Sequence, residues 1–128
     1  IDIKLHLPYL DQNLLIDRLA TKSPPENSAK TLIFYQNKIS HITELQAKRY
    51  HSTEKFNGTL TSAEISQYIH LIPILKAELK HATETLKLSS RAIIKIIKLS
   101  RTIADFDESP EIRLEHLKEA ICFTTFSP

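Results

Sequence analysis

The chain has 128 residues, of which 41% are hydrophobic, and this is enough for one modest domain with a core of its own. Its 17 Lys and Arg residues face 15 Asp and Glu residues, so the net charge of +2 and the pI of 8.7 are not by themselves evidence for a polyanionic partner. The single cysteine, Cys122, excludes an internal disulfide framework, and no run of the roughly 20 apolar residues that cross a bilayer occurs.

The composition favours helices. One glycine stands against six prolines, and stretches rich in Leu, Ile, Lys and Glu lie between the prolines. We therefore expect an all-α fold, a small bundle of about four to five helices. No HExxH or CxxC pattern occurs, so no metal site is expected. The N-terminus lacks signal-peptide features, so we expect a cytoplasmic protein with no membrane partner, and the start without Met favours a piece of a longer polypeptide.

Residues 1–7 alternate between apolar and polar side chains, the pattern of a half-buried strand that ends before Pro8. The apolar set is Ile1, Ile3, Leu5 and Leu7. Two readings stay open: a short extended tail, or the last strand of a sheet that lies upstream and leaves an exposed apolar edge here. A short apolar stretch then leads to the segment TKSPPENS at 21–28, which has the composition of a linker. We expect 1–27 to be a strand and linker and 28–128 to be a helical domain.

Apolar residues spaced by three or four predict the helices of this domain. We expect them at about 28–50, 61–70, 73–87 and 90–106, with a short final helix around Leu114, Leu117, Ala120 and Ile121. Thr61 followed by Glu64 is a capping-box pattern. Pro73 sits where the first turn of a helix tolerates proline.

The helix at 90–106 carries the most informative surface. Its apolar side chains cover roughly two thirds of the circumference, Phe106 among them, so we expect neighbouring elements to enclose the helix. The remaining polar stripe consists of Arg91, Lys95, Lys98, Thr102 and Asp105, with Arg101 at its edge. Three cations therefore line up at positions i, i+4 and i+7. The stripe is either a merely solvated face or a surface that binds an anion.

Arg91 favours the second reading. It lies in the first helical turn, where unpaired backbone N–H groups and the helix dipole favour an anion and make a cation mildly unfavourable. A cation at such a position makes sense if an anion docks beside it. A guanidinium also offers two parallel donors to a phosphate, a geometry that an ammonium group lacks.

Two segments resemble the sensor-2 helix and the final helix of bacterial Mg-chelatase-like, ComM-type (YifB-like) AAA+ ATPases: LKLSSRAIIKIIKLSRTIADF and, after a short loop, IRLEHLKEAI. Members of this family typically read L-x-L-S-x-R-A, then A-R-T-I-A-D-L, then H-L-x-E-A. The match is specific at 86–121. It extends more weakly upstream, where IDIKLHLP resembles a strand of the family's core, and FNGTL with TSAEI resembles the N-A-x-L entry to the lid.

The resemblance implies that 28–128 is the helical C-terminal lid domain of an AAA+ ATPase and that 1–27 derives from its core. It implies that Arg91 is the sensor-2 arginine, which contacts the γ-phosphate of ATP in cis or from a neighbouring subunit. Lys95, Lys98 and Arg101 are then supporting contacts to phosphate or DNA. The parent protein would bind ATP and Mg²⁺, contact its upstream AAA+ core and form a homo-oligomeric ring, a hexamer. ComM-type members act as branch-migration helicases, so DNA is a candidate partner.

The chain departs from the family pattern within this segment. Lys95 stands where the family usually has arginine, Ser100 where it has alanine, and Lys87 where glycine is common. The charge is kept at Lys95, but the fork geometry of a guanidinium is not. The usual aromatic-arginine ending after the last helix is also absent. These differences bear on fine contacts more than on the lid assignment.

No catalytic constellation is evident. The GxxxxGK[ST] loop, the acidic Walker-B strand and the sensor-1 segment do not occur, so we expect no catalytic residue here and no ATP hydrolysis by this chain alone. Cys122 has no evident activating base. Glu78 and His81 form one Glu-x-x-His pair, whereas a di-iron bundle needs two, so we interpret the pair as a surface contact of a helix.

Two other functions stay open. A free-standing nucleic-acid-binding module would use Lys95, Lys98, Arg101, Lys48 and Arg49 against phosphates, and its binding would depend on salt. A protein-interaction bundle would bind no such ligand. An Arg91→Ala change that leaves the parent ATPase unaffected would favour the interaction bundle.

Overall fold

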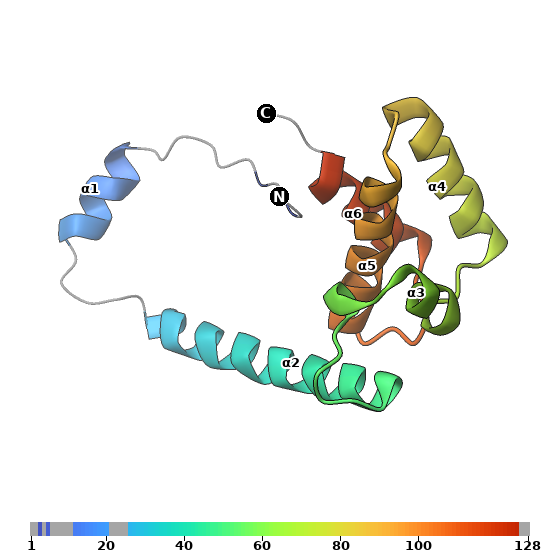
Figure 1. Ribbon diagram of the computed structural model, residues 1–128. Helices are drawn as coiled ribbons and strands as arrows, with labels where there is room; N and C mark the ends of the chain where they lie inside the picture. The colour runs from blue at the N-terminus through green and yellow to red at the C-terminus, as the bar shows by residue number, and fades with distance from the viewer. Residues whose placement is uncertain (1–2, 4, 6–11, 21–25, 126–128) are drawn as a thin grey trace.

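The computed structural model describes residues 3, 5, 12–20 and 26–125, and every regular element among these residues is helical (Figure 1). In chain order the elements are α1 (Gln12–Ala20), α2 (Glu26–Tyr50), the 3₁₀ helix η1 (Asn57–Thr59), α3 (Ser62–Tyr68), α4 (Pro73–Leu86), α5 (Ser90–Phe106) and α6 (Leu114–Thr125). The expected all-α bundle is confirmed. The helices predicted from the spacing of apolar residues are present as α2 to α6.

The N-terminal part differs from the expectation. We expected only a short apolar stretch before the linker, whereas Gln12–Ala20 form α1. A helix of 9 residues has fewer than three turns, which is too short for apolar periodicity to identify. The strand predicted at 1–7 lies largely outside the described residues. Ile3 and Leu5, which are described, belong to no strand, and both are exposed.

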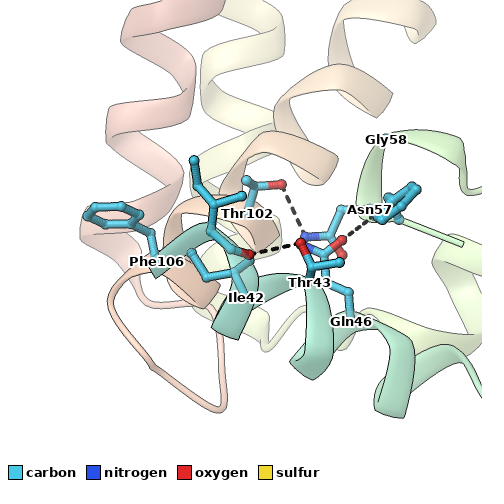
Figure 2. Close-up of a pocket in the computed structure, with 9 residues that line it drawn as sticks. Ile42, Thr43, Gln46, Asn57, Gly58, Thr102 and Phe106 are labelled. Atoms are coloured by element: carbon cyan, nitrogen blue, oxygen red, sulfur yellow. Dashed lines mark hydrogen bonds between the residues drawn. The ribbon is translucent and has the colours of Figure 1, made fainter. Parts of the chain in front are cut away.

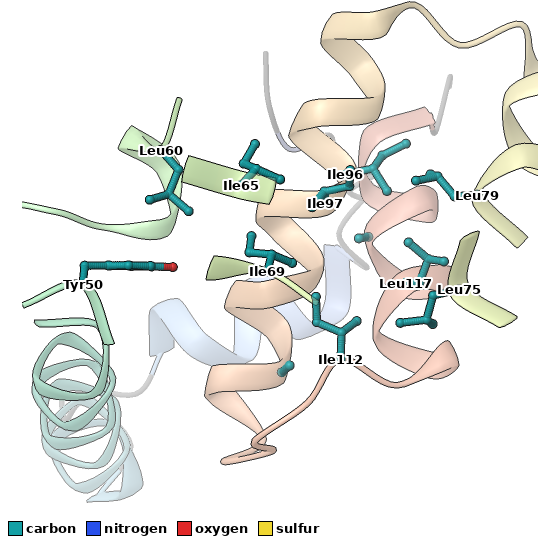
Figure 3. Close-up of a cluster of buried hydrophobic side chains, with 12 residues drawn as sticks. Tyr50, Leu60, Ile65, Ile69, Leu75, Leu79, Ile96, Ile97, Ile112 and Leu117 are labelled. Carbon is teal, nitrogen blue, oxygen red and sulfur yellow. The ribbon is translucent and has the colours of Figure 1, made fainter. Parts of the chain in front are cut away.

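Helix α5 is the central element of the bundle. It packs along α6 and also contacts α2 and η1, while α4 lies against α6 (Figure 1). The buried hydrophobic cluster draws on all the helices from α2 to α6 and on the segments between them (Figure 3). It consists of Tyr50, Leu60, Ile65, Ile69, Leu75, Leu79, Ile96, Ile97, Ala104, Ile112, Leu117 and Ala120. Three of these residues, Ile96, Ile97 and Ala104, come from α5, so the core holds this helix along most of its length.

Two helix starts follow the local sequence signals. Thr61 Oγ1 accepts the N–H of Glu64 at 3.3 Å, and the Glu64 carboxylate accepts the N–H of Thr61 at 2.8 Å, so the predicted capping box is confirmed. Ser89 caps α5, because its Oγ accepts the N–H of Ala92 at 3.2 Å. The capped turn places the next residues of α5 in a defined direction.

A histidine takes the place of the capping-box carboxylate at the start of α6. His116 is 1% exposed, and its Nδ1 accepts the N–H of Arg113 at 3.0 Å. Because Nδ1 accepts, Nε2 carries the proton and donates it to Asp107 Oδ2 at 2.8 Å. His116, which is the histidine of the family's H-L-x-E-A pattern, therefore connects the start of α6 to the end of α5.

Three helices end on a residue with left-handed backbone, and none of the three is glycine. The residues are His51, Lys87 and Glu108, with φ of 51°, 52° and 55°. The N–H of the following residue reaches back to a carbonyl five positions earlier at 3.1, 3.2 and 2.8 Å, which is the Schellman pattern. Lys87 occupies the position where the family commonly has glycine, and the left-handed φ explains this preference because glycine has no Cβ to strain.

Helix α2 packs on the bundle mainly with its C-terminal half, although the ring of Tyr35 also stacks on Phe106 of α5. The apolar stripe predicted for this helix is buried at Ile42 and Tyr50, but Leu32, Tyr35 and Ile39 expose 59%, 47% and 60% of their surface. The N-terminal half extends beyond the bundle (Figure 1), so this part of the expected buried stripe lies open in the described structure. None of the helices in the described ranges is long and apolar enough to cross a membrane.

Candidate phosphate-binding site

Three of the predicted cations lie around one hollow of about 450 Å³, called the cationic hollow below. Arg91, Lys95 and Lys98 share one face of α5, because residues three and four apart are neighbours on a helix surface. The other described lining residues are Ile3, Gly58, Leu99 and Thr102. No carboxylate lines the hollow in the part of the chain that the structure describes, so the charge around it is positive.

The three cations differ in how they are held. Arg91 is exposed and, among the described residues, has no hydrogen-bond or ion-pair partner. Lys95 is half-buried and already has an interaction partner. Lys98 Nζ donates to the carbonyl oxygen of Gly58 at 3.0 Å, which ties α5 to η1 across the hollow. Arg91 is therefore the cation whose whole guanidinium is available to an incoming anion.

The chemistry of the hollow suits a phosphate. Arg91 lies in the first turn of α5, where the positive end of the helix dipole adds to the field. Its guanidinium can donate two parallel hydrogen bonds to one phosphate group, while Lys95 and Lys98 add positive charge without the fork geometry of a guanidinium. The hollow does not suit Mg²⁺, which prefers oxygen ligands. In the described ranges no group of three His, Cys, Asp or Glu residues could hold a metal ion.

Arg101, the fourth predicted contact, does not lie with the other three. It is 5% exposed, and its Nε and Nη2 donate to Asp105 Oδ1 at 3.1 and 2.8 Å. Its Nη2 and Nη1 also donate to the carbonyls of Ser109 and Pro110 at 2.7 and 3.1 Å. These bonds use every nitrogen of the guanidinium within the protein. Arg101 therefore holds the end of α5 to the loop that follows. The polar stripe of α5 is closed to solvent at Arg101 and Asp105, while Thr102 is exposed.

Asp105 is the centre of a buried polar cluster, called the Asp105 cluster below. It is 1% exposed, although the sequence placed it on a polar stripe. Arg49 of α2 binds both carboxylate oxygens, with Nη1 at 3.0 Å from Oδ2 and Nη2 at 2.5 Å from Oδ1. Asn57 Nδ2 donates to Oδ2 at 2.9 Å, and Arg101 binds from the same helix. One carboxylate thus joins α2, η1 and α5.

The charges of the Asp105 cluster stabilise one another. Burial by itself raises the pKa of Asp105, but hydrogen bonds from Arg49 and Asn57 and the charge of Arg101 hold this pKa below its usual value. Burial likewise acts to lower the pKa of Arg49, but its hydrogen bonds and its proximity to Asp105 raise the pKa above the usual value. Asp105 and Arg49 are therefore both charged at neutral pH.

A second, apolar hollow of about 350 Å³ shares Gly58 and Thr102 with the cationic one (Figure 2). Its apolar lining residues are Ile39, Ile42, Phe56 and Phe106. Phe106, which we expected to be enclosed, is 40% exposed here because it is the last residue of α5. Figure 2 shows Asn57 between Gln46 and Thr102, two of the residues to which it is hydrogen bonded.

The residues of the Asp105 cluster were missed as a unit from the sequence. From the sequence we named Arg49 only as a phosphate contact of a nucleic-acid-binding module, and we included Asn57 only within the segment FNGTL. The hypothesis of a nucleic-acid-binding module needs five cations. Two of them, Arg49 and Arg101, are bound to Asp105, while Lys48 is exposed. The sequence signal that could have identified the cluster was the resemblance of FNGTL and RTIADF to family patterns. In the structure, these two segments supply Asn57, Arg101 and Asp105, which bind one another.

The comparisons with known proteins agree with the resemblance. Residues 28–124 match the family described as magnesium chelatase, subunit ChlI C-terminal. The chain is 33% identical to the uncharacterized protein YifB of Escherichia coli over 122 residues, which are 95% of this chain and 22% of YifB. It is also 33% identical to the competence protein ComM of Haemophilus influenzae over 120 residues, which are 94% of this chain and 22% of ComM.

The chain thus spans 22% of the length of each of these two curated relatives. The family match covers most of the chain, and both relatives align along nearly all of it. The chain therefore belongs to the magnesium chelatase subunit ChlI C-terminal family, as the C-terminal domain of a Mg-chelatase-like protein of the ComM and YifB type.

Proposed function

We propose that this domain is the lid of an ATP-hydrolysing AAA+ protein and that Arg91 binds the γ-phosphate of ATP, held by its own or a neighbouring subunit. The observation that carries the proposal is the position of Arg91. It is exposed, has no partner among the described residues, and lines a hollow with Lys95 and Lys98 in which no described carboxylate competes. A guanidinium there stabilises the negative charge that develops on the transferred phosphoryl group.

The proposal extends to the whole protein. Residues 28–128 form the lid, and 1–27 connect it to a nucleotide-binding core that supplies the phosphate loop and the Mg²⁺ site. Loss of the γ-phosphate contact after hydrolysis releases the lid and moves neighbouring subunits of a homo-oligomeric, hexameric ring in the cytoplasm. The work that we propose for the ring is DNA branch migration, which the resemblance to ComM-type ATPases implies; one relative is the competence protein ComM.

The test uses Arg91→Ala in the full-length protein, with ATP hydrolysis as the assay. Removal of one donor to a developing negative charge lowers kcat by roughly 100-fold or more. Arg91→Lys keeps the charge without the fork and should fall between Arg91→Ala and the unchanged protein. The matched control is Arg113→Ala, because the side chain of Arg113 is 66% exposed and has only a surface ion pair with Glu115 at 3.5 Å.

Because Arg91 is exposed and unpaired among the described residues, its removal should leave the thermal stability of the domain unchanged. The proposal fails if Arg91→Ala hydrolyses ATP as fast as Arg113→Ala does. A loss of activity that comes with a matching loss of stability would also count against it, since Arg91 would then have a structural role.

A further inference from the structure

Asn57 holds the wall of the cationic hollow although it does not line the hollow itself. It is 1% exposed, and every polar atom of its side chain is used. Its Nδ2 donates to Thr102 Oγ1 at 3.1 Å and to Asp105 Oδ2 at 2.9 Å, and its Oδ1 accepts from Tyr50 Oη and from Arg49 Nη1. The side chain therefore binds to α2 and α5 at once.

The backbone of the same residue has a separate anchor. The N–H of Asn57 donates to Gln46 Oε1 of α2 at 2.9 Å, and Gln46 is 5% exposed. The η1 turn is thus fixed both through the Asp105 cluster and directly to α2. Few degrees of freedom remain for the residue that follows, Gly58.

Gly58 is the point where this anchoring reaches the hollow. Its carbonyl oxygen accepts from Lys98 Nζ at 3.0 Å. The bond uses one of the three ammonium hydrogens, so it orients Lys98 at the hollow and leaves two donors for an anion. The glycine itself is not required for this, because its φ is not positive and a Cβ built at Gly58 meets nothing within 4 Å. What matters is the position of the carbonyl.

We infer that Asn57 is a positioning residue of the phosphate site: it places the Gly58 carbonyl that holds Lys98 ready at the cationic hollow. The inference rests on the proposed function, since it concerns the same site. Lysine loses rotamer freedom when it binds a phosphate, and a lysine already held in place loses less on binding. Release of the η1 turn should therefore weaken phosphate binding even though no cation has been removed.

The test measures binding of inorganic tripolyphosphate to the 128-residue chain by titration, together with the NMR signal of the Lys98 ammonium group. Asn57→Ala should weaken binding about three- to tenfold, the cost of ordering one long side chain, and should broaden the ammonium signal. In a Lys98→Ala background the same change should have no further effect on affinity, because the two residues act through one bond.

Two further variants separate positioning from stability. Gln46→Leu removes the backbone anchor of Asn57 but leaves the ligands of Asp105 in place, so it should weaken binding in the same direction even if Asn57→Ala does not fold. Gly58→Ala is the control that keeps the carbonyl, and it should bind tripolyphosphate as the unchanged chain does.

The outcomes distinguish this inference from the proposed function. If tripolyphosphate binding is lost in Arg91→Ala but unchanged in both Asn57→Ala and Gln46→Leu, the positioning role is wrong and the phosphate site stands. If Asn57→Ala weakens tripolyphosphate binding equally in the unchanged chain and in the Lys98→Ala background, its effect is merely structural. That result would also overturn the inference. If the unchanged chain does not bind tripolyphosphate at the hollow, the inference about Asn57 fails, whereas the role of Arg91 is decided by the ATP hydrolysis of Arg91→Ala in the full-length protein.

Discussion

Removal of the Asp105 carboxylate should destabilise the domain more than any other single change in its charged residues. In Asp105→Ala the buried guanidinium of Arg101 keeps two backbone carbonyls but loses its counter-ion. Removal of one partner of a buried ion pair costs about 3–5 kcal/mol. Arg49, whose side chain is 23% exposed, can turn to water, and Asn57 keeps its bond to Thr102. We therefore expect the lower end of this range, about 3 kcal/mol.

This loss is a large part of the roughly 5–15 kcal/mol that stabilise a typical domain. It can be measured by urea denaturation at neutral pH, followed by the circular dichroism of the helices. The control is Glu108→Gln. Glu108 also lies at the end of α5, but its own side chain is 57% exposed, so its pairs with Lys38 and His41 should contribute less than about 1 kcal/mol. A loss below 1 kcal/mol for Asp105→Ala would refute the view that the cluster joins α2 to α5.

Two further predictions concern stability. Because the folded-state pKa of Asp105 is lowered, its contribution is complete above the unfolded-state pKa of about 3.9 and disappears as the pH falls through the folded value. Urea denaturation between neutral pH and about pH 2 should show that the free energy of unfolding falls less with acid in Asp105→Asn than in the unchanged chain. The same fall in both proteins would contradict the prediction. Lys87→Gly should stabilise the domain by about 0.5 kcal/mol, since relief of a left-handed backbone outweighs the entropy of glycine. The control Lys80→Gly, at an exposed position inside α4, should destabilise the domain by about 1 kcal/mol. If both variants lower the free energy of unfolding, the backbone of Lys87 is not strained.

Much of the helical architecture could be read from local patterns. The bounds of α5 at Ser90–Phe106 and the capping box of Thr61 and Glu64 depend on contacts between residues three or four apart, which the sequence contains directly. Helix α1 was not predicted, because Gln12–Ala20 is too short for periodicity to mark it. The left-handed ending at Lys87 was visible only as a departure from a family glycine.

The sequence by itself determined that Arg91, Lys95 and Lys98 would share one surface, because the helical repeat alone places residues at i, i+4 and i+7 on one face. Only the tertiary structure decided which polar residues of the same stripe would be buried. Arg49 and Asp105 are 56 positions apart, and their pairing exists because α2 crosses the end of α5. Helical periodicity gives the direction of a side chain from its own axis, but burial depends on what the other helices bring to that side.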